Sequence, residues 1–257
     1  MKKEVEWLLK EKYHGVPGPE FEKDVERLNR GEPLDYVIGF TEFLGCKIDL
    51  SKKPLIPRPE TEYWVEKAIK EIKNRKSFGS AQDKINNRLF ILDVFAGSGC
   101  VGVSIMRHIN NAEVVFAEKD KNALEQIKIN CKINNIDKEK YKIVKSDVFS
   151  GVKGKFDYIF ANPPYVSNNQ ETRNKIQKSV LQYEPTNALF GGENGLFYIR
   201  KFLAKAPDFL YPKGRIYMEF DSIQKVQIEK LLKKYGYVAR EFYKDQYGKW
   251  RWVVVDN

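Results

Sequence analysis

The chain has 257 residues, of which 42% are hydrophobic and 13% aromatic, enough apolar material for one large domain with a small appendage. No run approaches the ~20 apolar residues of a membrane span, and no secretory segment follows Met1, so we expect a cytoplasmic protein without membrane contact. The net charge of +10 permits a phosphate-bearing partner, but lysines and glutamates are interspersed along the expected helices, as on solvated surfaces. Two distant histidines and three scattered cysteines offer little for a metal centre, a disulfide framework or a Ser-His-Asp triad.

The first part of the chain is predicted to be helical. Residues 4–13 carry apolar side chains at helical spacing, and residues 19–31 begin with a proline and end on a glycine that suits a helix C-terminus. Two such short helices cannot bury a core alone, so they should pack on the larger remainder of the chain. We therefore expect a small helical region over 1–41 and a second domain over 42–257.

A hairpin, a helix and a connector are expected next. Residues 43–50 and 52–57 suggest the two arms of a small hairpin. A helix is predicted across residues 57–72, because acidic residues occupy its first turn and apolar residues recur at helical spacing. Residues 73–90 are polar and form a predicted surface connector.

The remainder alternates between strand and helix patterns. Strands are expected within residues 88–99, 112–120, 141–149, 156–165 and 214–220, and helices within 101–109, 122–135, 195–210 and 222–236. Residues 238–256 read as two further strands around Gly248. This alternation predicts an α/β fold with a mostly parallel sheet covered on both faces and an antiparallel C-terminal hairpin. Ligands in such folds bind at the carboxyl ends of the strands.

The first strand ends in "DVFAGSG", which runs from Asp93 to Gly99. Small residues at this turn let the backbone approach a ligand, and the following helix N-terminus attracts negative groups. Gly97, Gly99 and Gly102 fit the GxGxxG spacing, so a nicotinamide enzyme has to be considered. A glycine turn alone is weak evidence, because any tight strand-to-helix turn uses glycine.

The next two strands end in carboxylates. Glu118 lies about twenty residues beyond the glycine turn, where a carboxylate can accept the ribose hydroxyls of an adenosine. Asp147 could accept from an adenine amino group, with Val148 and Phe149 beside the ring. Taken alone, the glutamate could begin an exposed helix and the aspartate could cap a turn. Together the three ends predict a pocket for a nucleotide or for S-adenosylmethionine.

The fourth strand ends in Asn162-Pro163-Pro164-Tyr165. The Asn162 side-chain oxygen and the Pro163 carbonyl, held by two fixed φ angles, are rigid acceptors that can grip both hydrogens of an –NH₂ group. Tyr165 can stack on a planar partner. Such a grip can aim the nitrogen lone pair at an electrophile, and orientation lowers barriers by up to ~7–11 kcal/mol in the best cases. Hydride transfer has no use for this arrangement, so methyl transfer is favoured.

Three stretches carry a resemblance to a known family. "FANPPYV" looks like the signature of S-adenosylmethionine-dependent amino-methyltransferases. "LIPRPETE" over residues 55–62 and "YEPTNALFGGENGL" over residues 183–196 resemble the protein glutamine methyltransferases that act on release factors. The resemblance implies a Rossmann-like class I methyltransferase fold. It further implies N5-methylation of the glutamine in the Gly-Gly-Gln motif of class 1 peptide chain release factors.

The resemblance also implies roles for particular residues. Asn162 and Pro163 would hold the glutamine amide with Pro164 completing the rigid segment, and Tyr165 would pack against it. The residues that would contact S-adenosylmethionine are Phe95, Ala96, Gly97, Ser98, Gly99, Glu118, Val148 and Asn162. We add Asp147, because its carboxylate could accept from the adenine amino group. The "PRPETE" segment either only begins a helix or also places Arg58 or Thr61 in the active cleft.

Phe95 departs from the family pattern, which usually has glycine there. With Phe95, the turn resembles the FxGxG turn of nucleic-acid adenine methyltransferases. The alternative function is therefore methylation of adenine N6 or another exocyclic amine in RNA or DNA. A ribosomal-protein glutamine methyltransferase and a non-catalytic adenosine-binding module also remain open. No separate stretch for base flipping is present. We therefore expect a monomer that acts on release factors and does not require nucleic acid.

Overall fold

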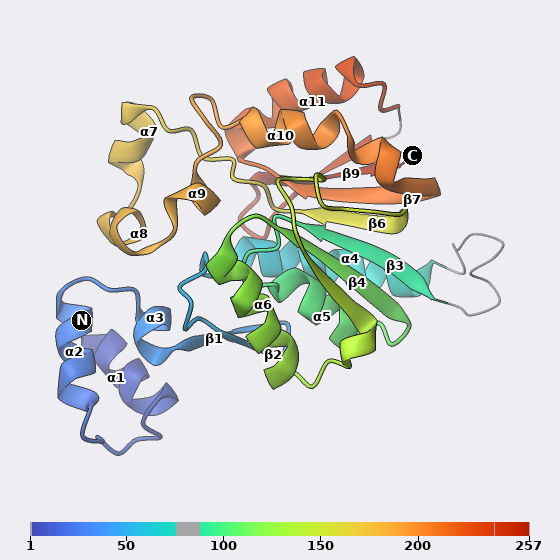
Figure 1. Cartoon of the computed structure of the whole chain (residues 1–257). Helices are drawn as coiled ribbons and strands as arrows, with labels where there is room; N and C mark the ends of the chain where they lie inside the picture. The colour runs from blue at the N-terminus through green and yellow to red at the C-terminus, as the bar shows by residue number, and fades with distance from the viewer. Residues whose placement is uncertain (1, 76–87, 239, 257) are drawn as a thin grey trace.

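The computed structural model describes residues 2–75, 88–238 and 240–256. Most of the predicted connector at 73–90 therefore lies outside the described residues. Figure 1 shows a twisted central sheet with helices packed against it, and the N-terminal helices gathered at one side. Within the described ranges, no helix has the length and hydropathy needed to cross a membrane.

The N-terminal region packs around a small core made by Leu8, Leu28 and Val37. Both predicted helices are present, and a third short helix comes after them: α1 (Lys2–Glu11), α2 (Phe21–Asn29) and α3 (Leu34–Ile38). Asp24 is buried among these helices and accepts hydrogen bonds from Lys12 and Tyr13 at 2.6 and 2.7 Å. The expected division after residue 41 falls within the strand β1 (Phe40–Phe43).

The described residues form a central sheet of seven strands in the order β5-β4-β3-β6-β7-β9-β8. The strands are β3 (Leu89–Val94), β4 (Ala112–Glu118), β5 (Tyr141–Lys145), β6 (Phe156–Ala161), β7 (Leu210–Glu219), β8 (Arg240–Lys244) and β9 (Trp250–Asp256). The first five in this order pair in parallel, and β9 runs antiparallel to both of its neighbours. The predicted α/β fold is confirmed, and β9 inserts between β7 and β8 rather than extending the edge.

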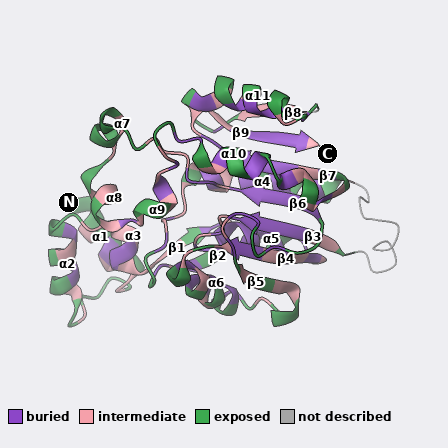
Figure 2. Ribbon diagram, turned by 45° about the horizontal axis from the view of Figure 1, so that its top comes forward, coloured by how far each residue is buried: buried purple, intermediate pink, exposed green. Residues whose placement is uncertain are grey.

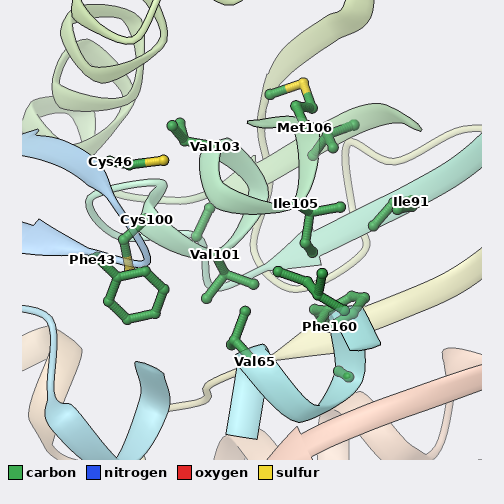
Figure 3. Packing of buried hydrophobic residues seen from close by; sticks show 14 of the residues in the cluster. Phe43, Cys46, Val65, Ile91, Cys100, Val101, Val103, Ile105, Met106 and Phe160 are labelled. Carbon is green, nitrogen blue, oxygen red and sulfur yellow. The ribbon is translucent and has the colours of Figure 1, made fainter. Parts of the chain in front are cut away.

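Helices cover both faces of the sheet, because strand residues alternate between two apolar clusters. On β6, Tyr158 and Phe160 belong to one cluster, and Ile159 and Ala161 to the other. The first face carries α4 (Pro59–Asn74), α5 (Cys100–His108) and α6 (Lys121–Ile133), and the second carries α10 (Phe197–Leu203) and α11 (Lys225–Lys234). Figure 2 shows the inner strands of the sheet as largely buried, and Figure 3 shows Val65 of α4 near Phe160 and residues of α5.

Three parts of the sequence prediction differ from the structure in detail. The hairpin consists of β1 and β2 (Cys46–Asp49), whereas residues 52–57 form no strand. The two prolines in that stretch have no N–H to donate to a ladder. Three short helices also come after Tyr165 where none was expected: α7 (Gln170–Lys175), α8 (Lys178–Tyr183) and α9 (Thr186–Leu189). The predicted helix over 195–210 is α10 followed by the short 3-10 helix η3 (Ala206–Phe209).

Candidate active site

A cavity of about 380 Å³ lies at the carboxyl ends of β3, β4 and β6. It brings together most of the residues that the sequence singled out: Phe95, Ala96, Gly97, Ser98, Glu118, Asp147, Val148, Asn162 and Pro164. Arg58 and Thr61 also line it, so the "PRPETE" segment does reach the cleft. Among the described residues, Gly99, Pro163 and Tyr165 lie outside this lining.

The turn after β3 has three residues with positive φ: Phe95 at 60°, Gly97 at 53° and Gly99 at 78°. A side chain tolerates this conformation poorly, so Phe95 sits where glycine would be unstrained. The phenylalanine ring packs edge-on against Tyr198, with ring centroids 5.9 Å apart, and lies 6.3 Å from the ring of Phe202. Aromatic packing of this kind offsets the backbone strain.

Gly102 serves the packing of α5 on the sheet. A Cβ atom at this position would lie 2.3 Å from Cε1 of Phe116 on β4. Its amide donates to Asp93 at 3.0 Å. Burial raises the pKa of Asp93 to about 7, with the Gly102 amide opposing the rise and the charge of Glu118 adding to it. The glycine spacing that suggested a dinucleotide fold therefore has a structural reason here.

Glu118 is held at the cavity by backbone amides. One carboxylate oxygen accepts from Gly97 at 2.8 Å, and the other accepts from Lys119 and Asp120 at 2.6 and 2.8 Å. Burial raises the pKa of this carboxyl, and the three amides oppose that rise. The side chain therefore has a fixed direction and links β4 to the glycine turn.

Asp147 offers an acceptor that no described residue satisfies. Its Oδ2 accepts from Lys201 at 3.1 Å, while its Oδ1 is buried without a hydrogen-bond partner in the described part of the chain. Buried polar atoms are almost always paired, so Oδ1 fits a ligand donor such as an amino group. Val148 beside it is buried and has a φ of 59°. Phe149 instead stacks on Phe202 and Phe209, away from the lining.

Asn162 comes directly after the last residue of β6, and its Nδ2 donates to Thr61 at 3.3 Å. Within the described ranges, its Oδ1 and the carbonyl of Pro163 have no hydrogen-bond partner. Pro163 itself is buried. The hydroxyl of Tyr165 donates to Glu219 at 2.9 Å, so this ring is tied to the end of β7.

Glu219 is a site residue that sequence reasoning missed. It is 1% exposed and also accepts from Thr61 Oγ1 at 2.7 Å and from Trp64 Nε1 at 2.6 Å. Burial raises the pKa of its carboxyl, whereas these three donors and the charge of Arg251 oppose the rise. The available signal was a single carboxylate within the apolar strand "GRIYMEF".

The "FGGENG" segment packs against the backbone of the tetrapeptide that runs from Asn162 to Tyr165. A Cβ on Gly191 would lie 2.2 Å from the carbonyl oxygen of Pro164, and one on Gly195 would lie 2.0 Å from that of Tyr165. Gln224 donates to the same Tyr165 carbonyl at 2.9 Å. Only glycine permits this close approach of two backbone segments.

Comparisons with known proteins agree with this arrangement. The family model "Methyltransferase small domain" matches residues 82–187. The crystal structure of a methyltransferase from Pyrococcus furiosus shares the fold, with a TM-score of 0.57 and 22% identity, over 82% of this chain and 88% of that chain. Fold and cavity define a class I methyltransferase, a class in which S-adenosylmethionine donates the methyl group.

Relatives narrow the class. The release factor glutamine methyltransferase of Clostridium botulinum is 33% identical over 84% of this chain and 73% of its own length. The one from Streptococcus pneumoniae is 32% identical over 93% of this chain and 80% of its own length. The chain belongs to the release factor glutamine methyltransferase family.

Proposed function

We propose that this enzyme transfers a methyl group from S-adenosylmethionine to N5 of the glutamine in the Gly-Gly-Gln motif of class 1 peptide chain release factors. The observation that carries the proposal is a pair of neighbouring acceptors without a hydrogen-bond partner among the described residues: Oδ1 of Asn162, a residue that lines the cavity, and the carbonyl of Pro163, which follows it. The names of the relatives support the same substrate.

The donor set fits S-adenosylmethionine. Glu118 would accept from the ribose hydroxyls, the unpartnered Oδ1 of Asp147 would accept from the adenine amino group, and the glycine turn would lie along the methionine portion. When bound, this cofactor supplies a methyl group on a positively charged sulfur. Glu118 is held by three backbone amides and Asp147 by Lys201, so both carboxylates are oriented before the cofactor arrives.

Asn162 and Pro163 act on the amide nitrogen of the substrate. This nitrogen is a poor nucleophile, because its lone pair is delocalised into the carbonyl. Two acceptors that each take one hydrogen fix the orientation of the –NH₂ group and favour a conformation in which the lone pair is available. The two prolines restrict the backbone that follows Asn162, and Gly191 and Gly195 lie against the carbonyls of Pro164 and Tyr165. The backbone that carries both acceptors is therefore held in place.

Four broader proposals accompany this function. The enzyme works in the cytoplasm, where release factors act. It works as a monomer, and it needs no nucleic acid. Residues 1–41 form a helical region distinct from the methyltransferase domain over 42–257. The separate apolar cluster of Leu8, Leu28 and Val37 supports that division.

The test incubates the protein with radiolabelled S-adenosylmethionine and one acceptor at a time. The acceptors are a release factor, the same factor with the motif glutamine replaced by alanine, a ribosomal protein and a structured RNA. We expect label only in the intact release factor. Asn162→Ala should lower kcat by about 100-fold or more, as for loss of one preorganised hydrogen-bonding group. Label in RNA or in the ribosomal protein, with none in release factor, would overturn the proposal.

A further inference from the structure

The side-chain amide of Asn162 has two ends of the same shape and opposite hydrogen-bonding character. Only its oxygen can accept a hydrogen from a substrate –NH₂ group, whereas its own –NH₂ end would repel that group. Rotation of the amide by half a turn would exchange the two ends at little steric cost. Some neighbouring group must therefore decide which end faces the cavity.

Hydrogen bonds that connect Glu219 to Thr61, and Thr61 to Asn162, determine which end of the amide faces the cavity. A carboxylate can only accept, and its Oε2 takes hydrogens from Trp64 Nε1 and Thr61 Oγ1 at 2.6 and 2.7 Å. A hydroxyl has one hydrogen, so Thr61 has none left to donate. Its oxygen can then only accept from Asn162, and the group found 3.3 Å from it is Nδ2.

We propose that Glu219 and Thr61 are positioning residues that fix the amide of Asn162 with its oxygen toward the substrate. Neither residue needs to touch the reacting atoms. The consequence for catalysis rests on the proposed function, since it requires a substrate –NH₂ group. The orientation of Asn162 itself does not depend on which substrate the enzyme methylates.

The hydrogen bonds that connect Glu219, Thr61 and Asn162 lie in a buried and well-packed part of the fold. Thr61 is 2% exposed and Trp64 is fully buried, with its indole stacked on Phe160 at a centroid distance of 5.9 Å. Tyr165 donates to the other carboxylate oxygen of Glu219 and prevents its rotation. Helix α4 and the segment after β6 thus converge on one buried carboxylate of β7. The direction of these hydrogen bonds is set before any ligand binds.

The first experiment observes the orientation in the free protein. In ¹⁵N-labelled protein, Asn162→Asp identifies the Asn162 side-chain amide signal by its loss. We expect one of its two hydrogens to exchange with water at least about tenfold more slowly than the other, because it is bound to Thr61. Thr61→Val should bring both hydrogens to the same rate, while Trp64→Phe, which removes a different bond to the same Glu219 oxygen, should preserve the difference. Equal rates in the unmodified protein would overturn the proposal.

The second experiment measures methylation of a release factor by the same variants. Thr61→Val should lower kcat about tenfold or more while the cofactor dissociation constant changes less than about threefold, and Thr61→Ser, which restores the hydroxyl, should recover most of kcat. Thermal unfolding of each variant separates this effect from loss of fold. The proposal is wrong if Thr61→Val keeps its kcat, or if Trp64→Phe of equal thermal stability loses as much. If no release factor is methylated by any form, the proposed function fails, and the exchange data still decide the orientation.

Discussion

Asp93 should make the stability of this protein depend on pH in a way that one substitution removes. The carboxyl is 3% exposed, and it accepts a hydrogen bond from the amide of Gly102 at 3.0 Å. Burial raises its pKa from the ordinary 3.8 to about 7. The folded protein therefore holds this proton across a pH range in which the unfolded chain has already released it.

The sign and size of the effect come from that difference. Folding is favoured by the retained proton below about pH 4, and this contribution is lost as the pH rises toward 7. The interval between the two pKa values corresponds to at most about 4 kcal/mol. Asp93→Asn removes the titration but keeps an oxygen that can accept from Gly102. About two of the roughly three pKa units between the unfolded and folded values lie above pH 5. The free energy of unfolding of Asp93→Asn should therefore rise relative to that of the unmodified protein by about 2.5–3 kcal/mol between pH 5 and pH 8.

Urea unfolding followed by tryptophan fluorescence measures this difference, because Trp64 and Trp252 are buried. Both proteins are unfolded without cofactor at several pH values. All other titrating groups are common to the two proteins. The comparison therefore isolates Asp93 together with its interaction with Glu118, whose charge raises the pKa of Asp93. A stability difference that stays constant within about 0.5 kcal/mol across this range would show that Asp93 is already charged in the folded protein, and would refute the reasoning.

Three further substitutions test the packing and the cofactor site. Gly102→Ala should lower the free energy of unfolding by about 1–3 kcal/mol, because the new methyl group overlaps Phe116; unchanged urea unfolding would contradict this. Gly191→Ala should reduce kcat while leaving cofactor affinity nearly unchanged, since its methyl group would displace the Pro164 carbonyl. Equal kcat in steady-state assays would exclude that effect. Glu118→Ala should weaken cofactor binding by about 1.5–3 kcal/mol, and calorimetry showing unchanged affinity would remove Glu118 from the cofactor site.

The residues at the strand ends could be predicted for two reasons. Each strand is visible as a local pattern in the sequence, and the carboxyl ends of parallel strands meet at the same edge of any such sheet. Alternation of strand and helix predicts a parallel sheet, and parallel strands bring their carboxyl ends to one edge. Phe95, Glu118, Asp147 and Asn162 therefore meet at one cavity, as expected from the sequence. The helices α7 and α8 escaped prediction because none of their residues is buried, so they leave no apolar period.

Glu219 could not be found in the same way. Its partners Thr61, Trp64 and Tyr165 lie 158, 155 and 54 residues away in the chain. No local pattern relates residues at such separations, and a lone glutamate in a strand is compatible with an exposed position. Only the tertiary fold shows that the side chain is buried and that it accepts three hydrogen bonds.

The same fold explains why the stretches 55–62 and 183–196 accompany the Asn162 tetrapeptide. Glu184 is buried and accepts from the amide of Ile56 at 3.1 Å and from Arg58 at 2.7 Å. Removal of one partner would leave a buried charge uncompensated, which is strongly destabilising. The first stretch supplies Thr61 to Asn162, and the second supplies Gly191 and Gly195 to the backbone beside it. Each stretch therefore depends on the other two for its position, and together they form one wall of the active site.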